Sequence, residues 1–122
     1  MPVHDAGDIA CADLDPVRGT EQGKRRPALV LTSRRYNELS GRAVICPITS
    51  SAGEWPFNVP LPEGLRTHGV VLVDQVRAVD RASRVFRKIE SAPAQLMSDV
   101  RAMLAVVLGI EPTALTGFRI DL

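Results

Sequence analysis

The chain has 122 residues, a length that suits one domain with a buried core and is short for two. Hydrophobic residues make up 45% of the chain, and no apolar run approaches the roughly 18 residues that a membrane span needs. The formal net charge is +1 at pH 7. These features argue against a membrane protein. Since the first eight residues lack the basic start and apolar stretch of a signal peptide, the expected compartment is the cytoplasm.

The small net charge hides an uneven distribution of charge along the chain. Residues 1–17 have a net charge of −4, residues 18–42 of +5 and residues 66–88 of +4. Thirteen of the fifteen cationic residues are Arg, whose planar guanidinium suits phosphate and stacks on bases. The distribution favours a polyanionic partner, although a solvated charged surface explains the composition equally well.

Short runs of Val, Ile and Leu between Gly and Pro residues predict a small antiparallel sheet or barrel. The expected strands cover about residues 8–14, 28–32, 42–48, 57–60, 69–73 and 84–89. A long polar connection, residues 15–27, follows the first strand, and loops of that length are usually functional or disordered. Residues 34–41 predict a short helical turn that ends at Gly41.

An amphipathic helix is predicted from Pro93 to Leu108. Its apolar residues recur every three or four positions, which indicates core packing along the whole stripe: Leu96, Val100, Met103, Leu104, Val107 and Leu108. Pro93 suits the first turn and Gly109 the C-cap. Because no period continues afterwards, the prediction is one domain over residues 1–109 and a loose tail over residues 110–122.

The sequence offers no pattern for a metal or a cofactor. His4 and His68 are isolated, and Cys11 and Cys46 are spaced like neither a zinc site nor a redox pair, so both cysteines should remain thiols. The glycine-rich nucleotide-binding patterns and the GxSxG pattern of hydrolases are absent from the sequence. We therefore expect no metal and no cofactor.

Two polar loops remain as candidates for chemistry. One ends in residues 24–27 (Lys-Arg-Arg-Pro), the other opens with residues 49–51 (Thr-Ser-Ser), and both adjoin strands expected to be neighbours. Internal cleavage of RNA requires activation of a 2′-hydroxyl, support of a phosphorane and protonation of the leaving oxygen. Arg and Thr side chains can donate to the phosphorane, and Glu21 or Asp74 is a candidate to take the 2′-proton. On spacing alone, a surface cation and a turn-capping Thr are the simpler interpretation.

Seven blocks of the sequence form a recognisable set. They are Gly7 to Ile9, Asp13 to Gln22, Arg26 to Leu31, Tyr36-Asn37, Cys46 to Ser50, Pro56-Phe57 and Asp74 to Arg77. In this order and spacing they resemble the MazF/PemK/Kid toxins, relatives of the CcdB gyrase poison, over about residues 7–109.

The resemblance implies a mainly β fold with a C-terminal helix, an SH3-like small barrel of the MazF/CcdB type. It also implies the toxin of a type II toxin–antitoxin system, a ribosome-independent endoribonuclease that needs no metal and cuts single-stranded RNA sequence-selectively. The implied products are 2′,3′-cyclic phosphate and 5′-OH ends.

The resemblance also assigns roles to single residues. The Arg before Pro in the family's second strand falls on Arg26, and the first Thr of its Pro-x-Thr-[Thr/Ser] segment falls on Thr49, so these two are the implied catalytic pair. Because Arg is hard to deprotonate, charge stabilisation is the favoured role for Arg26. Trp55 and Phe57 are candidates for base stacking, and Phe57 is equally a candidate core residue. The remaining implied substrate contacts are Glu21, Gln22, Arg25, Ser50, Asp74, Gln75 and Arg77.

The implied partners are single-stranded RNA, a second copy of the chain and a MazE-like antitoxin with an acidic, disordered tail over the basic groove. The sequence departs from the family pattern at Cys11, where Trp is common, at Gly53 and Glu54, where a Lys-Gly pair is common, and in the tail. Two alternatives stay open. One is a CcdB-like gyrase poison that cuts no nucleic acid, and the other is a member that binds RNA but cleaves poorly because of the altered second loop.

Overall fold

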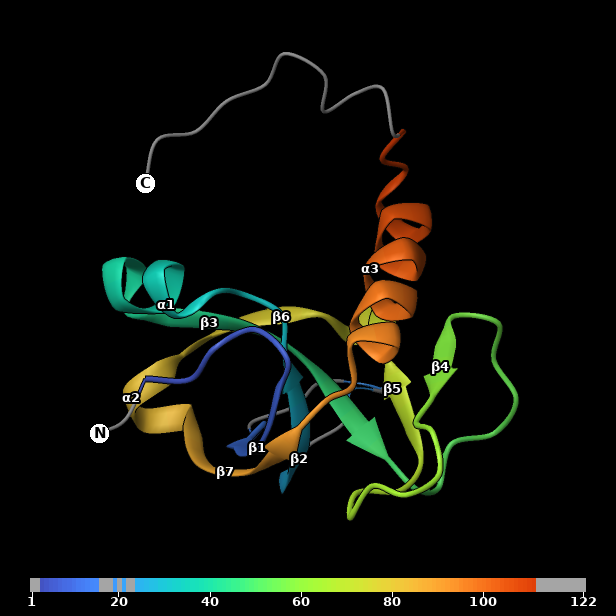
Figure 1. The fold of residues 1–122 in the computed structure, drawn as a ribbon, viewed down its shortest axis with the longest axis horizontal. Helices are drawn as coiled ribbons and strands as arrows, with labels where there is room; N and C mark the ends of the chain where they lie inside the picture. Colours follow the sequence, from blue (N-terminus) through green and yellow to red (C-terminus); the bar gives the residue numbers. More distant parts are fainter. Residues whose placement is uncertain (1–2, 16–18, 20, 22–23, 112–122) are drawn as a thin grey trace.

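The computed structural model describes residues 3–15, 19, 21 and 24–111. Over these residues the chain forms one antiparallel sheet in the order β4-β5-β3-β2-β1-β7, with β6 paired to β3 outside this path (Figure 1). The elements are β1 (Asp8–Asp13), β2 (Arg25–Val30), α1 (Arg34–Ser40), β3 (Arg42–Thr49), β4 (Asn58–Pro60), β5 (Val70–Leu72), the 3₁₀ helix η1 (Val73–Gln75), β6 (Arg77–Asp80), α2 (Arg81–Arg84), β7 (Val85–Ser91) and α3 (Ala94–Leu108).

Strand β3 holds the sheet together because it pairs with three other strands. Residues 45–47 pair with β2, residues 42–45 pair with β6, and residues 48–49 pair with β5. Since Ile45 is opposite both Val30 of β2 and Arg77 of β6, these partners lie on the two edges of β3. The end of β3 is therefore enclosed between the start of β2 and the start of β5.

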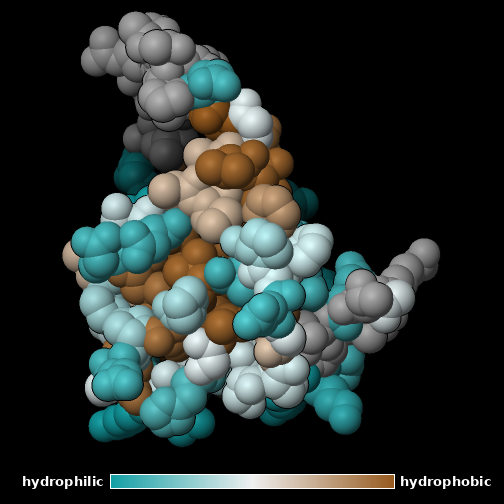
Figure 2. Space-filling model, turned by 90° about the vertical axis from the view of Figure 1, so that its right-hand side faces the viewer, coloured by the Kyte–Doolittle hydropathy of each residue, from teal (hydrophilic) through white to brown (hydrophobic). Residues whose placement is uncertain are grey.

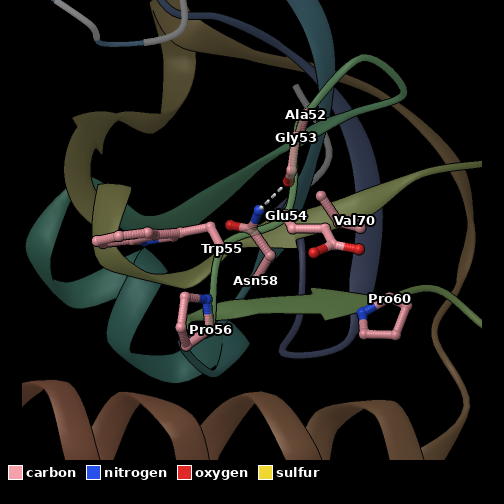
Figure 3. Close-up of a pocket in the computed structure, with 8 residues that line it drawn as sticks. All are labelled: Ala52, Gly53, Glu54, Trp55, Pro56, Asn58, Pro60 and Val70. Atoms are coloured by element: carbon pink, nitrogen blue, oxygen red, sulfur yellow. Dashed lines mark hydrogen bonds between the residues drawn. The ribbon is translucent and has the colours of Figure 1, made fainter.

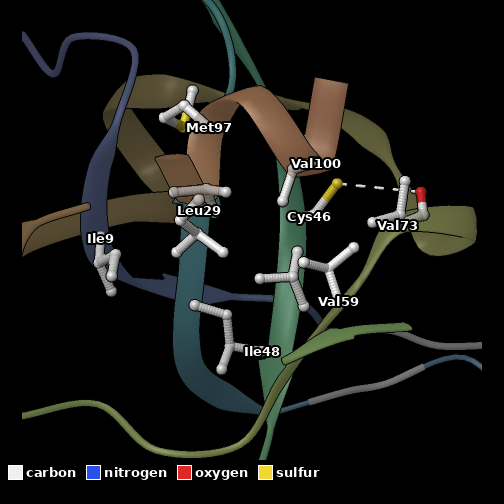
Figure 4. Close-up of a cluster of buried hydrophobic side chains, with 10 residues drawn as sticks. Ile9, Leu29, Cys46, Ile48, Val59, Val73, Met97 and Val100 are labelled. Atoms are coloured by element: carbon white, nitrogen blue, oxygen red, sulfur yellow. Dashed lines mark hydrogen bonds between the residues drawn. The ribbon is translucent and has the colours of Figure 1, made fainter. Parts of the chain in front are cut away.

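Alternating side chains of the strands supply two buried clusters, as the two-residue period of a strand requires. The first cluster lies under α3 and is drawn in Figure 4; it comprises Ile9, Leu29, Cys46, Ile48, Val59, Val71, Val73, Leu96, Met97 and Val100. The second is made by the intervening residues Ala10, Ala12, Leu14, Ala28, Val30, Ala43, Ile45, Val79 and Val85. Both faces of the central strands are therefore covered, which explains their nearly continuous apolar sequence.

The two cysteines are free thiols, as expected. Cys46 is fully buried, and its Sγ lies 3.9 Å from the carbonyl oxygen of Val73 (Figure 4). Burial, with a smaller contribution from the negative charge of Asp74, raises the pKa of Cys46 to about 12.

The predicted mainly β class and the C-terminal helix are confirmed, and the pairing among the described strands leaves the barrel open between β4 and β7. The helical turn before Gly41 is confirmed, with Gly41 in the left-handed conformation at φ 70°. Strand β6 was missed because only one of its four residues, Val79, is buried. Strand β2 begins at Arg25 rather than near residue 28, since its ladder with β1 extends to the pair Asp13 and Arg25.

The prediction for the C-terminal helix is correct in its bounds and partly wrong in its packing. Helix α3 ends at Gly109 as expected, and Pro93 is the N-cap residue rather than part of the first turn. Its first half packs on the sheet, but its second half projects beyond the sheet (Figure 1) and leaves Leu108 57% exposed. Figure 2 shows hydrophobic residues on this projecting part, where Val106 and Ile110 are also exposed. Among the described residues, no helix is long and apolar enough to cross a membrane.

Candidate functional site

An open hollow of about 620 Å³ lies where the start of β2 meets the end of β3. We call it the arginine hollow. Its lining residues are Arg25, Arg26, Pro27, Ile48, Thr49, Ser50, Ser51, Arg66, Thr67, His68 and Ile89. Four parts of the chain that are distant in the sequence therefore share one concave surface.

Strand register explains why Arg26 and Thr49 meet in this hollow. In the β2–β3 ladder Ala28 is opposite Pro47 and Leu29 is opposite Cys46. Continuing this antiparallel register by two residues puts Arg26 opposite Thr49. Residues directly opposite each other in an antiparallel pair have neighbouring side chains. The predicted pair is thus brought together by the sheet, and both residues line the hollow.

Thr49 is the last residue of β3 and is only 4% exposed. Its Oγ1 accepts a hydrogen bond from the backbone N–H of Ser51 at 3.3 Å and lies 3.2 Å from Ser51 Oγ. The hydroxyl therefore does stabilise the turn after β3, as the simpler interpretation expects. The same bonds fix the position of the hydroxyl at the surface of the hollow, where it can act as a donor.

Residues 66–68 form a third wall of the arginine hollow. The carboxylate of Glu90, on β7, accepts hydrogen bonds from the backbone N–H of Arg66 at 3.0 Å and of Thr67 at 2.8 Å, and from Thr67 Oγ1 at 2.7 Å. Burial alone would raise the pKa of Glu90, but the hydrogen bonds from Thr67 and Arg66 outweigh it and lower that pKa below its ordinary value. A charged carboxylate therefore anchors this wall.

The charges of the arginine hollow suit a phosphodiester. Among the described residues that line it, Arg25, Arg26 and Arg66 are cationic and none is Asp or Glu. Guanidinium groups and hydroxyls are donors that match the oxygens of a phosphate. Across the described part of the chain, no three His, Cys, Asp or Glu side chains gather as a metal site would need. The hollow can thus hold and stabilise a negatively charged phosphorane.

A second concave surface adjoins the first one, and we call it the tryptophan hollow. It is lined by Ala52, Gly53, Glu54, Trp55, Pro56, Asn58, Pro60, Val70, Leu72, Asp74 and Gln75. Trp55 is 52% exposed, and its Nε1 donates to Asp74 Oδ2 at 2.8 Å. Its ring meets Phe57 edge to face, with centroids 5.4 Å apart. Figure 3 shows the Trp55 ring on one side of Asn58 and the Glu54 carboxylate on the other, toward Val70 and Pro60.

The predicted site residues divide between these two hollows. Arg26, Thr49, Arg25 and Ser50 line the arginine hollow, whereas Trp55, Asp74 and Gln75 line the tryptophan hollow. Phe57 supports the Trp55 ring from its edge.

Two predicted residues, Glu21 and Arg77, lie elsewhere in the described part of the chain. Glu21 is exposed and lines neither hollow, and Gln22 lies outside the described residues. Arg77 Nη1 donates to the carbonyl oxygen of Leu14 at 3.2 Å, so it connects β6 to the end of β1. Neither candidate for the 2′-proton, Glu21 or Asp74, is among the described lining residues of the arginine hollow.

Sequence analysis missed Arg66, Thr67 and His68 as parts of the site. Residues 66–68 follow β4 by several positions and share no motif with Arg26 or Thr49. Only the β3–β5 ladder, in which Thr49 is opposite Val70, brings this segment to the hollow. The beginning of a basic stretch at Arg66 was the one signal in the sequence.

The fold and the arginine hollow define a small β protein with an arginine-lined hollow where β2 begins and β3 ends. Residues 5–108 match the family described as PemK-like, MazF-like toxin of type II toxin–antitoxin systems. The endoribonuclease toxin MazF of Escherichia coli K12 is 37% identical over 108 residues, which cover 88% of this chain and 96% of that protein.

Solved structures agree with the sequence relatives. A crystal structure of MazF from Deinococcus radiodurans has a TM-score of 0.85 and 43% identity, with 89% of this chain and 99% of that chain covered. A MazE–MazF structure from the same organism has a TM-score of 0.78 and 38% identity, with 91% of this chain and 100% of that chain covered. The chain therefore belongs to the PemK-like, MazF-like toxin family of type II toxin–antitoxin systems.

Proposed function

We propose that this chain, an endoribonuclease toxin, cuts single-stranded RNA without a metal ion or a ribosome and leaves 2′,3′-cyclic phosphate and 5′-OH ends. Arg26 and Thr49 are the catalytic pair. The observation that carries the proposal is that Arg26 of β2 and Thr49 of β3 line one hollow, together with two further arginines and with no carboxylate among its described lining residues. The relative named above, MazF of Escherichia coli, is an endoribonuclease toxin, and its name gives no support to a gyrase poison.

The pair acts on the phosphorus that the 2′-oxygen attacks. As the phosphorane forms, its non-bridging oxygens gain negative charge, and the Arg26 guanidinium and the Thr49 hydroxyl donate to them. Both donors are positioned before the substrate arrives, because Arg26 stands on a paired strand and the Thr49 hydroxyl is held by Ser51. One such donor typically contributes about 3 to 4 kcal/mol of transition-state stabilisation.

The tryptophan hollow supplies contacts to the bases. Trp55 offers an exposed aromatic face, and the neighbouring Asp74 and Gln75 offer acceptors and donors for base edges. Selection among RNA sequences then depends on this second surface, since phosphates carry no sequence information. Glu54 adds a carboxylate that disfavours phosphate and favours base amino groups there.

The physiological partners are a MazE-like antitoxin and a second copy of the toxin, in the cytoplasm. An acidic, disordered antitoxin tail complements the three arginines of the arginine hollow, so its affinity should weaken as salt increases. The projecting apolar end of α3, with Val106, Leu108 and Ile110 exposed, supports an association that covers it. The domain boundary after residue 109 stays a prediction, since residues 112–122 of the predicted tail lie outside the described residues.

The experiment compares the wild-type chain with Arg26→Ala on a long single-stranded RNA in EDTA, with cut ends mapped by sequencing. We expect discrete wild-type cuts with 2′,3′-cyclic phosphate ends and none with the variant. Arg101→Ala, which removes an exposed arginine of α3 remote from the hollow, is the matched control and should cut like the wild type. Cleavage by Arg26→Ala at the wild-type rate would refute the site assignment.

A weakly cleaving, RNA-binding member is the second candidate, because Gly53 and Glu54 change the second loop. It would bind the same RNA with an affinity that falls with salt, by a log–log slope of about 0.7 per phosphate neutralised, and release no product. Binding without cutting by the wild-type chain would favour it.

A further inference from the structure

The proposed reaction needs a group that accepts the proton of the attacking 2′-hydroxyl. Arg remains protonated in proteins, and a Thr or Ser hydroxyl is too weak a base at neutral pH. Asp74 lines the other hollow, where its Oδ2 accepts from Trp55, and Glu21 lines neither. Neither carboxylate is therefore among the described residues that line the hollow with Arg26 and Thr49.

His68 is the one described lining residue of the arginine hollow whose side chain is a base near neutral pH. It is exposed to solvent and shares the hollow with Arg26 and Thr49, so RNA bound there can reach it. Neutral imidazole has a free ring nitrogen that can accept a proton from a hydroxyl group.

The backbone on both sides of His68 is fixed, which a catalytic base requires. On one side, Glu90 holds Arg66 and Thr67 through three hydrogen bonds. On the other side, Gly69 has φ +119°, and a Cβ there would lie 2.1 Å from the carbonyl oxygen of Thr49. Only glycine allows this approach, so the backbone next to His68 packs directly on the backbone of Thr49.

We propose that His68 is the general base of the cleavage reaction; this inference rests on the proposed function. Neutral imidazole takes the proton of the 2′-hydroxyl while the 2′-oxygen forms a bond to phosphorus. The bond from phosphorus to the 5′-oxygen breaks, and that oxygen takes a proton from water to become the 5′-OH end. The imidazolium then returns its proton to solvent, so the cyclic phosphate product forms with no net change at the enzyme.

The charged groups around His68 come from three elements. Arg25 and Arg26 of β2 and Arg66 of the same loop line the hollow with His68, and Glu90 of β7 bonds to residues 66 and 67 of that loop. The arginines remain charged across the range in which imidazole titrates, and the Glu90 carboxylate, with its lowered pKa, is ionised throughout it. A pH dependence near neutral pH can therefore be assigned to the imidazole.

The test measures single-turnover cleavage of a short RNA at saturating protein from pH 5 to pH 9, for the wild-type chain and His68→Gln. The wild-type rate should rise with pH on the acidic side and level off above neutral pH. General bases typically contribute about 10²- to 10⁴-fold, so His68→Gln should be slower by at least a hundredfold at pH 8 and should lack the rise. RNA affinity, measured with a 2′-deoxy substrate that cannot be cut, should change little.

A control variant and a modified substrate sharpen the result. His4→Gln changes the other histidine, which lines a separate hollow with Asp5 and Lys88, and should keep the wild-type pH profile. A substrate with sulfur in place of the 5′-oxygen has a leaving group that needs no proton. His68→Gln should stay slow on it; recovery to the wild-type rate would show that His68 is an acid and would overturn its role as the base.

The outcomes separate this inference from the proposed function. If the wild-type chain cuts RNA and His68→Gln retains both the rate and the pH profile, the role of His68 is refuted and the function stands. If the wild-type chain makes no product, the proposed function itself fails. If added imidazole restores RNA cleavage by His68→Ala but not by Arg26→Ala, this result would further support the role of His68 as the base.

Discussion

The arginine hollow and the tryptophan hollow are neighbours of opposite character. Residues 49–55 line both of them, Thr49 to Ser51 on one side and Ala52 to Trp55 on the other. The first hollow has three arginines and small hydroxyl residues, whereas the second has an exposed indole, amides and the carboxylates of Glu54 and Asp74. A single loop thus separates a surface suited to the RNA backbone from a surface suited to its bases.

This difference shows how one small sheet can carry a catalytic site that tolerates little change beside a second site that can vary in the RNA sequences it selects. The groups of the arginine hollow are held by strand register and by the buried end of β3, where a change in one residue alters the pairing of its neighbours. The aromatic groups of the tryptophan hollow stand on the loop between β3 and β4, outside the ladders. Loops accept substitutions more readily than paired strands do. Substitutions should therefore affect the rate constant in the first hollow and the choice of RNA in the second.

Among the variants that distinguish the roles of the two hollows, Thr49→Val is expected to have the largest effect, which is on kcat. It removes the hydroxyl and keeps the branched shape, so kcat should fall about 10²- to 10³-fold, while the affinity for an uncleavable RNA changes little. Single-turnover rates and binding of a 2′-deoxy substrate measure the two quantities. Thr49→Ser keeps the hydroxyl and should retain most of the rate. If Thr49→Val weakens binding and leaves kcat unchanged, the division between the hollows is wrong.

Trp55→Ala is expected to have a smaller effect, and this effect is on RNA affinity and not on the rate of cleavage. Stacking of a base on an aromatic ring contributes about 1 to 3 kcal/mol, so the Kd for RNA should rise about tenfold to a hundredfold, with the single-turnover rate at saturation nearly unchanged. Trp55→Phe keeps an aromatic face and removes the Nε1 donor to Asp74. It should bind almost as tightly but cut an altered set of sequences, which sequencing of the ends detects. Unchanged affinity in Trp55→Ala would exclude this surface from RNA binding.

The smallest effect is expected from Glu90→Gln, which loosens the third wall of the arginine hollow. Because the folded state lowers the pKa of Glu90 below its ordinary value of 4.5, its ionised form stabilises the fold above that pH, and this contribution is lost as pH falls through the lowered pKa. The variant should therefore be less stable at pH 7 by about 0.5 to 1 kcal/mol, a modest value since the group is partly exposed.

Denaturant unfolding of Glu90→Gln and the wild-type chain at pH 7 and at pH 3 measures this contribution. The difference between the two proteins should shrink at the lower pH. A constant difference across this range would mean that the hydrogen bonds to residues 66–67 do not depend on the charge of Glu90.

Sequence patterns located the elements whose apolar residues recur with a clear period. They did not locate elements that depend on pairing with another strand. The apolar period of α3 and the glycine after α1 located both helices to within a residue or two. Strand β6 has a single buried residue, Val79, and is a strand because β3 offers it an edge. The exposed end of α3 has the same apolar period as its buried beginning, since a period in the sequence does not show where the sheet stops.

The same distinction holds for the site. Arg26 and Thr49 were found from their family blocks, and the register of two consecutive strands brings them together. His68 is 19 residues after Thr49 in the sequence and reaches the hollow only through the β3–β5 ladder and the close approach of Gly69. An isolated histidine without a nearby partner gave no signal, because its partners are defined by the tertiary structure.

The buried thiol of Cys46 has a consequence for studying this molecule. A thiol with a pKa of about 12 that solvent does not reach hardly reacts with alkylating reagents in the native state, since the thiolate is the nucleophile. Cys46 lies between β3 and α3 in the first cluster, so it becomes reactive only when helix and sheet separate. The labelling rate of Cys46 in the wild-type chain therefore measures how often helix α3 and the sheet separate. It also measures how far a bound partner slows that separation.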